Sequence, residues 1–402
     1  MPVTILEALD LIATHTQALS TQTVPIEEAL GRVCAKTLYA SIALPTFNNS
    51  AMDGFALKGH HDTYTVVGKL LAGDAHSYDL QDAECVKIMT GAEVPSCADS
   101  VIPQENTSTQ EETIMIHKPV KVGANIRLKG EDINEGEDIV QKGEKISSAH
   151  VSLLASQGIT HVTVHRIPRV AVFASGSELK LHFEKLEKSQ VYNSNTPYLM
   201  ARSEELGCEA LFIGKAEDSV ASLQALIKDS LHCDLIVTSG GVSVGEADFT
   251  KEAFSGLACE NIFSKIQIKP GKPTTFGKIG TTLVLNLPGN PLASSLNFEI
   301  FGKMILMKLS GRKSVHHGFI NTKISKAFTM NRPVDTVLPG FFDGESFTPA
   351  KKFAPGNVNV LNHCNGMIIV DKETSVLKEN DSVKFMPIHW EFLKEEFVKF
   401  TS

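Results

Sequence analysis

Long apolar runs and aromatic side chains are scarce in this sequence. No stretch approaches the roughly 18 consecutive apolar residues of a membrane-spanning helix. The opening MPVTILEALDLIATH has neither the basic region nor the small-residue cleavage site of a secretory signal. Aromatic residues make up 7% of the chain, and only one of them is tryptophan. We therefore expect a cytoplasmic protein without a membrane partner.

Paired cysteines and clustered metal ligands are also missing. The seven cysteines form no CxxC pair and lie mostly within apolar runs, while the 14 histidines are scattered and form no HExxH motif. A zinc site needs such ligands close together, and a disulfide framework normally uses an even number of cysteines. The pattern argues against both kinds of site and is typical of reduced cysteines in a core.

The chain has no excess of positive charge. It carries 38 Lys and Arg against 46 Asp and Glu, so its formal charge is −8 and its pI about 6.0. This composition gives no general attraction for nucleic acid, and any anionic ligand must be held by local groups. The 402 residues are 42% hydrophobic and 21% charged, an ordinary globular mixture with room for roughly two to four domains.

Local patterns predict a helical start followed by a β-rich part. Thr4 and Glu7 have the spacing of a capping box, and the apolar residues after them predict a helix over 4–18. From about 38 to 164, short apolar stretches are broken every ten residues or so by Gly, Asn, Asp and Pro. This pattern predicts short strands, with one helix at 147–157.

Residues 169–312 alternate strand and helix patterns. The predicted strands are 169–174, 210–213, 234–238, 264–268 and 282–286, with helices at 196–206 and 219–231 among them. Near-continuous apolar strands joined by helices predict a doubly wound parallel sheet that is covered on both faces. Short strands and turns return over 316–402 and predict a small β domain.

Polar or glycine-rich turns follow the predicted strands of the alternating part. Ligands of an open parallel sheet bind beyond the carboxyl ends of its strands. The turn 239–245, SGGVSVG, offers backbone amides that can approach an anion closely, and Ser239 and Ser243 add hydroxyl donors. Lys269 and Lys272 add positive charge. Each turn alone has the alternative of being a tight turn with positive φ, but their repetition favours a site for a phosphorylated ligand.

Three carboxylates, Glu178, Asp218 and Asp248, follow the same strand ends. Each one alone has an ordinary alternative as a helix cap or as a complement to a helix dipole. Together they conflict electrostatically with an anion unless a divalent cation or a shared proton lies between them. A magnesium-type ion is the simplest hypothesis.

A second candidate site lies in the β-rich part. Asp53 stands in a Met-Asp-Gly turn, and Thr90 ends an apolar strand. Asp-Gly is a common turn pair, so the residues alone favour a structural role for Asp53.

Several of these segments occur together in a specific order. They are 45–56 (PTFNNSAMDGFA), 88–95 (IMTGAEVP), 125–136 (NIRLKGEDINEG), 174–179 (ASGSEL), 239–249 (SGGVSVGEADF), 269–277 (KPGKPTTFG) and 287–294 (LPGNPLAS). This set resembles the molybdopterin molybdenumtransferase family, which comprises MoeA in bacteria and the E domain of gephyrin in animals. The resemblance covers about residues 5–310, and the C-terminal part matches only in kind.

The resemblance implies the last general step of molybdenum cofactor synthesis. In this step, molybdenum from molybdate enters the dithiolene of adenylylated molybdopterin with Mg²⁺ present, the adenylyl phosphoanhydride is hydrolysed, and AMP is released. It also implies a homodimer in which the α/β domain of one subunit and the Met-Asp-Gly domain of the other share a cleft. A molybdopterin adenylyltransferase would be a partner in the pathway, and neither nucleic acid nor membrane would be involved.

The resemblance further implies four domains. They are a central molybdopterin-binding α/β domain (1–22 and 167–315), an extended linker domain (23–45 and 140–166), a β-rich domain with the Met-Asp-Gly motif (46–139), and a C-terminal domain like a small β-barrel (316–402).

Residue roles follow from the matching motifs. The catalytic polar set would be Asp53, Thr90, Glu178, Asp218 and Asp248, of which the last three would hold Mg²⁺. Phosphate and pterin groups would be held by Ser239, Gly240, Gly241, Ser243, Lys269 and Lys272, with Pro288 and Pro291 shaping the cleft floor. This chain has Asn48 where the family usually has an acid, and Phe55 where it has tyrosine. The change at Asn48 removes one potential ion contact.

Two other functions stay open at this point. One is a molybdopterin adenylyltransferase, a family that resembles only 169–310 and binds the same pterin. The other is a gephyrin-like scaffold that binds partner peptides between its α/β and C-terminal domains. Large exposed aromatic patches would support the scaffold, but aromatic residues make up only 7% of the chain.

Overall fold

The computed structural model describes residues 2–217, 219–240, 247–330 and 334–389, without the side chains of 247 and 248. The chain forms two compact units. Unit 1 comprises Met1–Lys36, Lys142–Ser147 and His161–Ser402, and unit 2 comprises Thr37–Gln141 and Ser148–Thr160. This division is coarser than the predicted four domains, so their boundaries stay a prediction. No helix in the described part of the chain is long and apolar enough to cross a membrane.

Unit 1 contains a six-stranded sheet in the order β16-β13-β17-β21-β20-β18. The first four strands pair in parallel and the last two are antiparallel. Their bounds are Glu209–Ala216 (β16), Arg169–Ser175 (β13), Leu235–Ser239 (β17), Thr282–Leu287 (β21), Thr275–Ile279 (β20) and Glu260–Phe263 (β18). The predicted α/β architecture is confirmed, although the sheet is mixed rather than wholly parallel.

Helices cover both faces of this sheet. Their bounds are Ile5–His15 (α1), Asn195–Glu205 (α3), Val220–Ser230 (α4), Ala247–Ser255 (α5), Pro291–Asn297 (α6) and Lys303–Leu309 (α7), with a π-helical turn, η3, at Phe298–Gly302. Alternate residues of one strand serve the two layers: Val172 packs in the cluster with α1, α3, α6 and α7, whereas Phe173 packs in the cluster with α4 and α5. A strand buried on both faces has no polar alternation, which explains the apolar runs in the sequence.

The predicted capping box of α1 is confirmed. Glu7 N donates to Thr4 Oγ1 over 3.2 Å, and Thr4 N donates to Glu7 Oε2 over 2.7 Å. The helix ends at His15 rather than at residue 18.

The predicted strand at 264–268 is wrong. Only Ile268–Lys269 forms a strand, β19, and it pairs in parallel with β24 of the C-terminal part instead of joining the central sheet. The sheet is completed by β20 and β18, which form no near-continuous apolar run. Pairing with a strand more than 60 residues away leaves no local sequence signal, so apolar pattern alone placed this segment in the wrong sheet.

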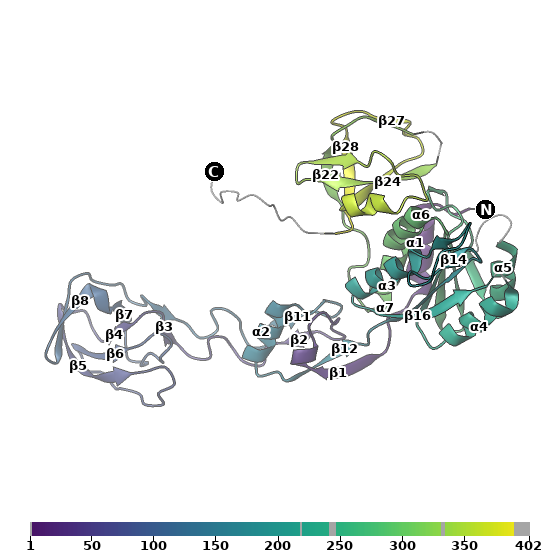
Figure 1. Cartoon of the computed structure of the whole chain (residues 1–402). Helices are drawn as coiled ribbons and strands as arrows, with labels where there is room; N and C mark the ends of the chain where they lie inside the picture. The colour runs from purple at the N-terminus through teal and green to yellow at the C-terminus, as the bar shows by residue number, and fades with distance from the viewer. Residues whose placement is uncertain (1, 218, 241–246, 331–333, 390–402) are drawn as a thin grey trace. The chain divides into compact units, whose positions relative to one another are not determined.

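The C-terminal part of unit 1 is a small closed barrel, as predicted. Its strands are Asp335–Phe342 (β24), Ser346–Pro349 (β25), Ile320–Ile324 (β22), Ser382–Pro387 (β28) and Gly366–Val370 (β26). The strands follow one another in this order, and an additional pairing between β24 and β26 closes the ring. Buried Leu338, Phe347 and Phe385 fill its interior. In Figure 1 this barrel is the yellow-green region that carries β22, β24 and β28.

Unit 2 is built on a six-stranded sheet in the order β7-β4-β6-β5-β9-β8. The strands are Ser100–Pro103 (β7), Gly54–Leu57 (β4), Glu84–Ile88 (β6), Thr63–Leu70 (β5), Thr113–Ile116 (β9) and Thr107–Gln110 (β8). Separate apolar clusters cover its two faces. The predicted helix at 147–157 is present as α2, Ser148–Ser156, and it is followed by Gly158 at a φ of +67°.

Short two-stranded ladders make up much of the remaining regular structure. They pair β1 (Thr21–Pro25) with β12 (His161–His165), β2 (Leu38–Tyr39) with β11 (Asp138–Val140), β3 (Asn49–Ser50) with β10 (Ile126–Arg127), β14 (Leu179–Lys180) with β15 (Val191–Tyr192), and β23 (Phe328–Thr329) with β27 (Val376–Leu377). Five of the seven cysteine side chains are buried, as the apolar runs around them predict.

His317 gives unit 1 a pH-dependent stability. Its Nε2 donates to the carbonyl of Ile300 over 2.7 Å, and burial lowers its pKa from the ordinary value of 6.5. Below pH 6.5, His317 is protonated in the unfolded chain but stays neutral in the folded chain until the pH reaches its lowered pKa. The free energy of unfolding therefore falls as the pH drops from 6.5 toward that pKa. We expect His317→Gln to flatten the decline in the free energy of unfolding between pH 7.5 and 5, as measured by urea denaturation. The same change at an exposed histidine of unit 1 that does not act on His317, His232→Gln, should leave the slope as it is, and an unaltered slope in His317→Gln would contradict the assignment.

Candidate functional site

Three neighbouring parallel strands, β13, β17 and β21, end side by side in unit 1. Ser239 closes β17, where it pairs with Ala174 on one side and with Leu287 on the other. Its hydroxyl donates to the carbonyl of Pro288 over 3.2 Å, and the next amide, Gly240 N, donates to Leu287 O over 3.3 Å. The predicted convergence of these strand ends is therefore present.

Glycines allow the three strand ends to meet at backbone distance. Gly240 has a φ of +99°, and a Cβ atom there would lie 2.6 Å from the carbonyl oxygen of Ser175. A Cβ atom on Gly289 would lie 3.3 Å from Gly240 Cα. The tight-turn reading of Gly240 is thus correct locally, and the same turn forms the crowded edge that a ligand of this sheet would meet.

Asn195 joins this edge and was not predicted from the sequence. It lies at the start of α3, and its Nδ2 donates to Ser239 Oγ over 2.6 Å and to Gly289 O over 2.7 Å. The only available signal was its place at a helix N-terminus beside the strand ends. The helix begins at Asn195, one residue before the predicted start at 196, and Thr196 is hydrogen-bonded to Asn193.

The two predicted prolines lie at the same edge. Pro288 is buried and accepts the hydrogen bond from Ser239, while Pro291 is the half-buried first residue of α6. Proline suits that helix position because its fixed φ is helical and no N–H is needed there.

Of the two predicted lysines, Lys269 ends strand β19 and Lys272 lies in the turn that follows it, so neither ends a strand of the central sheet. Asn297 holds this turn: its Nδ2 donates to Pro270 O over 3.1 Å, and a Cβ atom on Gly271 would lie 1.9 Å from that nitrogen. Thr274 Oγ1 closes the turn by donating to Gly271 O over 2.8 Å. Lys272 is exposed on it.

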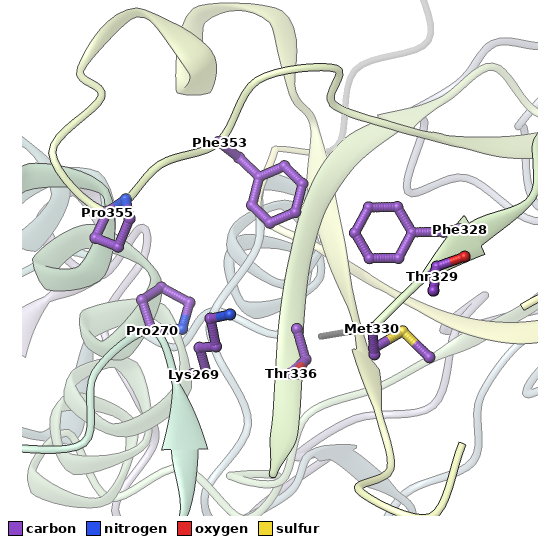
Figure 2. Close-up of a pocket in the computed structure, with 8 residues that line it drawn as sticks. All are labelled: Lys269, Pro270, Phe328, Thr329, Met330, Thr336, Phe353 and Pro355. Carbon is purple, nitrogen blue, oxygen red and sulfur yellow. The ribbon is translucent and has the colours of Figure 1, made fainter. Parts of the chain in front are cut away.

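Lys269 lines a small cavity of about 90 Å³. Figure 2 shows Lys269 and Pro270 on one side of this cavity, with Phe328 and Met330 of the barrel on the other. The rings of Phe328 and Phe353 lie 5.6 Å apart between centroids. The cavity is far below the roughly 300–1,000 Å³ of a typical ligand pocket, so it can take only a small group.

Only part of the predicted magnesium set can be placed. Glu178 is exposed, and its Oε2 lies 2.6 Å from the position of a Cβ atom on Gly176, so its carboxylate folds back over the end of β13. Asp218, Gly241 and Ser243 lie outside the described residues, as does the side chain of Asp248. Within the described part, no three His, Cys, Asp or Glu side chains are grouped so that they could hold a metal ion. The cap of α4 is Ser219, whose hydroxyl accepts from Ser222 N over 3.2 Å.

The second candidate site, in unit 2, is a hydrogen-bonded pair. Asp53 Oδ1 accepts from both the amide and the hydroxyl of Thr90, each over 2.8 Å, and both side chains are exposed. The hydrogen bond from the Thr90 amide, followed by the one from its hydroxyl, lowers the pKa of Asp53. The carboxylate is therefore ionised at neutral pH, and no described residue donates a hydrogen bond to its Oδ2. Gly54 follows because a Cβ atom there would lie 1.8 Å from Ile102 O.

The two departures from the family pattern have different surroundings. Asn48 Oδ1 accepts from Lys129 N over 2.8 Å, a bond that a carboxylate oxygen could equally accept. Asparagine in place of an acid at position 48 therefore removes a negative charge and keeps the hydrogen bond from Lys129 N. Phe55 is 4% exposed and packs in the apolar cluster of β4 with Leu57 and Ile102, where it has no need of a hydroxyl.

Comparisons with known proteins cover nearly the whole chain. The MoeA N-terminal region (domains I and II) matches residues 3–158, and a probable molybdopterin binding domain matches residues 171–308. The molybdopterin molybdenumtransferase of Staphylococcus aureus strain COL is 29% identical over 99% of this chain and 98% of its own length. The crystal structure of the molybdopterin biosynthesis MoeA protein from Pyrococcus horikosii is 30% identical, with a TM-score of 0.83 over 96% of this chain and 99% of that one. The chain belongs to the MoeA family.

The MoeA family assignment confirms the resemblance seen in the motifs. A second MoeA structure, from Pyrococcus horikoshii OT3, has the same TM-score of 0.83 at 23% identity and supports the fold alone. The two matched regions divide the candidate residues: Asp53 and Thr90 fall within the MoeA N-terminal region, and the strand-end residues fall within the molybdopterin binding domain. An adenylyltransferase function would give the matched MoeA N-terminal region, residues 3–158, no role.

Proposed function

We propose that this chain is a molybdopterin molybdenumtransferase of molybdenum cofactor biosynthesis. In the proposed reaction, molybdenum from molybdate enters adenylylated molybdopterin, water cleaves the phosphoanhydride, and AMP leaves. The observation that carries the proposal is the likeness to a molybdopterin molybdenumtransferase over the full length of both chains.

The placed residues supply suitable groups for this chemistry. The substrate is anionic, and so is the chain, at a formal charge of −8, so local donors must hold the substrate. Lys272, exposed on its turn, offers a charge-assisted hydrogen bond to phosphate. The small cavity beside Lys269 has room for a compact oxyanion and not for the pterin nucleotide. The ionised Asp53 can accept a proton as oxo groups leave molybdate as water.

The function is tested by incubating the purified protein with adenylylated molybdopterin, molybdate and Mg²⁺. We expect AMP release that depends on molybdate, together with formation of active cofactor. A protein that instead makes adenylylated molybdopterin from ATP, and releases no AMP when molybdate is added, would be an adenylyltransferase. Omission of Mg²⁺ with EDTA present should stop AMP release if the proposed magnesium requirement holds.

The proposal includes a homodimer whose active site takes Asp53 from one subunit and the strand ends from the other. Two inactive variants then complement each other: Asp53→Asn damages one half of the site and Gly240→Val the other. Mixed subunits should regain about a quarter of wild-type activity, because half of the dimers are mixed and each has one intact site. No recovery would show that each site is built within one chain.

Asn195→Asp should weaken the reaction. The change replaces the donating amide with a carboxylate oxygen that faces Ser239 Oγ and the carbonyl of Gly289, so both donated bonds at the strand ends are removed. The bond to Gly289 O has no replacement, whereas the Ser239 hydroxyl can keep a contact only by turning from Pro288 O to donate to the carboxylate. We expect a loss of about 1–3 kcal/mol in transition-state binding, measured as kcat/KM for AMP release. Ser194→Ala, in the preceding residue whose side chain makes no capping bond, serves as the control and should retain wild-type kinetics.

A further inference from the structure

The barrel carries a second groove, larger than the cavity of Figure 2. Its volume is about 740 Å³, and its walls include Phe341, Val358 and two adjacent lysines, Lys351 and Lys352. Phe341 and Val358 are 50% and 55% exposed. The ionisable residues that line the groove are these lysines and His363, so no acid is among them. Neither lysine pairs with an acid in the described part of the chain. The surface thus fits an occupant with both apolar and acidic side chains.

The last described residues of the chain lie beside this groove. The amides of Ile388 and His389 both donate to Asn365 O, over 2.9 and 3.1 Å. Asn365 N donates in turn to Gly340 O over 3.2 Å, and Asn365 Oδ1 accepts from Phe342 N over 2.8 Å. Gly340 and Phe341 line the groove. Asn365 is therefore hydrogen-bonded both to His389, the last described residue, and to Gly340 in the groove wall.

The residues that follow His389 carry both apolar and acidic side chains, the combination that the groove fits. Their sequence is WEFLKEEFVKFTS, residues 390–402. Trp390, Leu393, Phe397 and Phe400 recur at intervals of three and four, a pattern typical of an amphipathic segment. Its charged side chains are three acids, Glu391, Glu395 and Glu396, and two lysines, Lys394 and Lys399, so their formal charge is 2 − 3 = −1. Thirteen residues reach about 20 Å if helical and about twice that if extended, enough to cross the groove.

We propose that residues 390–402 bind in the groove of their own barrel, with their apolar side chains against Phe341 and Val358 and their carboxylates beside Lys351 and Lys352. Covalent attachment beside the groove gives the segment a millimolar effective concentration, so modest contacts are sufficient. The binding does not depend on the proposed enzymatic function.

The single tryptophan of the chain makes this proposal directly testable. It is Trp390, so intrinsic fluorescence reports on the segment alone. We expect blue-shifted emission that acrylamide quenches weakly. The double variant Lys351→Glu/Lys352→Glu should shift the emission to the red and raise quenching several-fold. Lys323→Glu/Lys326→Glu changes the same charge at exposed barrel positions outside the groove and should match the wild type.

A charge exchange separates loss of docking from loss of folding. Adding Glu395→Lys/Glu396→Lys to the Lys351→Glu/Lys352→Glu variant should restore the blue-shifted emission. In a second arm, a synthetic peptide of residues 390–402 should bind the chain truncated after His389, and about tenfold more weakly when both groove lysines are reversed.

Three results would overturn the proposal. Solvent-exposed emission from the wild-type protein would show that the segment does not dock. A blue shift that grows with protein concentration would assign the groove to the segment of a second copy. A failure of the charge exchange to restore the emission would place the segment elsewhere.

Discussion

Replacing Asp53 with asparagine should nearly abolish AMP release while leaving the protein folded. Asparagine keeps the shape of the side chain, and its Oδ1 can still accept both hydrogen bonds from Thr90. The other oxygen becomes a neutral NH₂ group, which can neither accept a proton nor bind a cation. We expect a loss of about 10²–10⁴-fold in kcat, the usual contribution of a positioned general base.

The matched control for this variant is Asp62→Asn, an exposed aspartate of the same unit. Both variants should retain wild-type circular dichroism and melting temperature, and only the Asp53 variant should lose turnover. The pH profile adds a check. Because hydrogen bonds lower the pKa of Asp53 below its ordinary value of 3.8, its protonation should not limit activity above about pH 4. Wild-type turnover by Asp53→Asn would remove this residue from the active site.

Replacing Arg202 with methionine should destabilise unit 1 by about 3–5 kcal/mol. Arg202 lies in α3 and is 7% exposed, and its partner Glu299, in the π-helical turn η3, is 1% exposed. Nε and Nη2 of the guanidinium donate to the two carboxylate oxygens over 2.6 and 3.1 Å, and Nη2 also donates to Ile388 O over 2.9 Å. Without the arginine, the buried carboxylate keeps, among the hydrogen bonds of the described residues, only the one from Tyr198.

Burial acts to lower the pKa of Arg202, but its hydrogen bonds and charge interaction with Glu299 raise it overall. Arg202 therefore stays charged beside Glu299, and the penalty in the single variant comes from leaving Glu299 buried without this partner. The double variant Arg202→Met/Glu299→Leu removes both charges and should recover most of the lost stability. Chemical denaturation followed by circular dichroism measures both. A loss below about 1 kcal/mol in the single variant would show that water replaces the arginine.

The central strands of unit 1 could be predicted because burial on both faces leaves a strong signal. Arg169–Ser175, Leu235–Ser239 and Thr282–Leu287 are near-continuous apolar runs that end in small polar turns. Strand β20, Thr275–Ile279, contains Gly277 and Lys278 and gives no such run. It was missed because its pairing with β21 is set by the neighbouring strand rather than by its own composition.

The candidate site was predictable to the extent that it consists of motifs. The turn at Ser239 and the Asp53–Thr90 pair stand out as sequence segments, and the structure places them in hydrogen-bonded contact within their own units. Asn195 carries no pattern, because its role depends on α3 packing its first turn against strands 40 and 90 residues away. The prediction for Lys269 failed for the opposite reason. Its local motif indicated the end of a strand of the central sheet, but this segment pairs with the distant strand β24 instead.

The pairing of β19 with β24 ties the two halves of unit 1 together in a way that bears on protein engineering. Strand β24 of the barrel pairs with Ile268 and Lys269, which precede two strands of the central sheet in the chain. A chimera with its crossover point near residue 316 would therefore join a foreign barrel to a mismatched β19, or leave the edge of β24 unpaired and prone to aggregation. Grafts that transplant residues 268–273 together with the barrel should stay soluble where simple fusions do not.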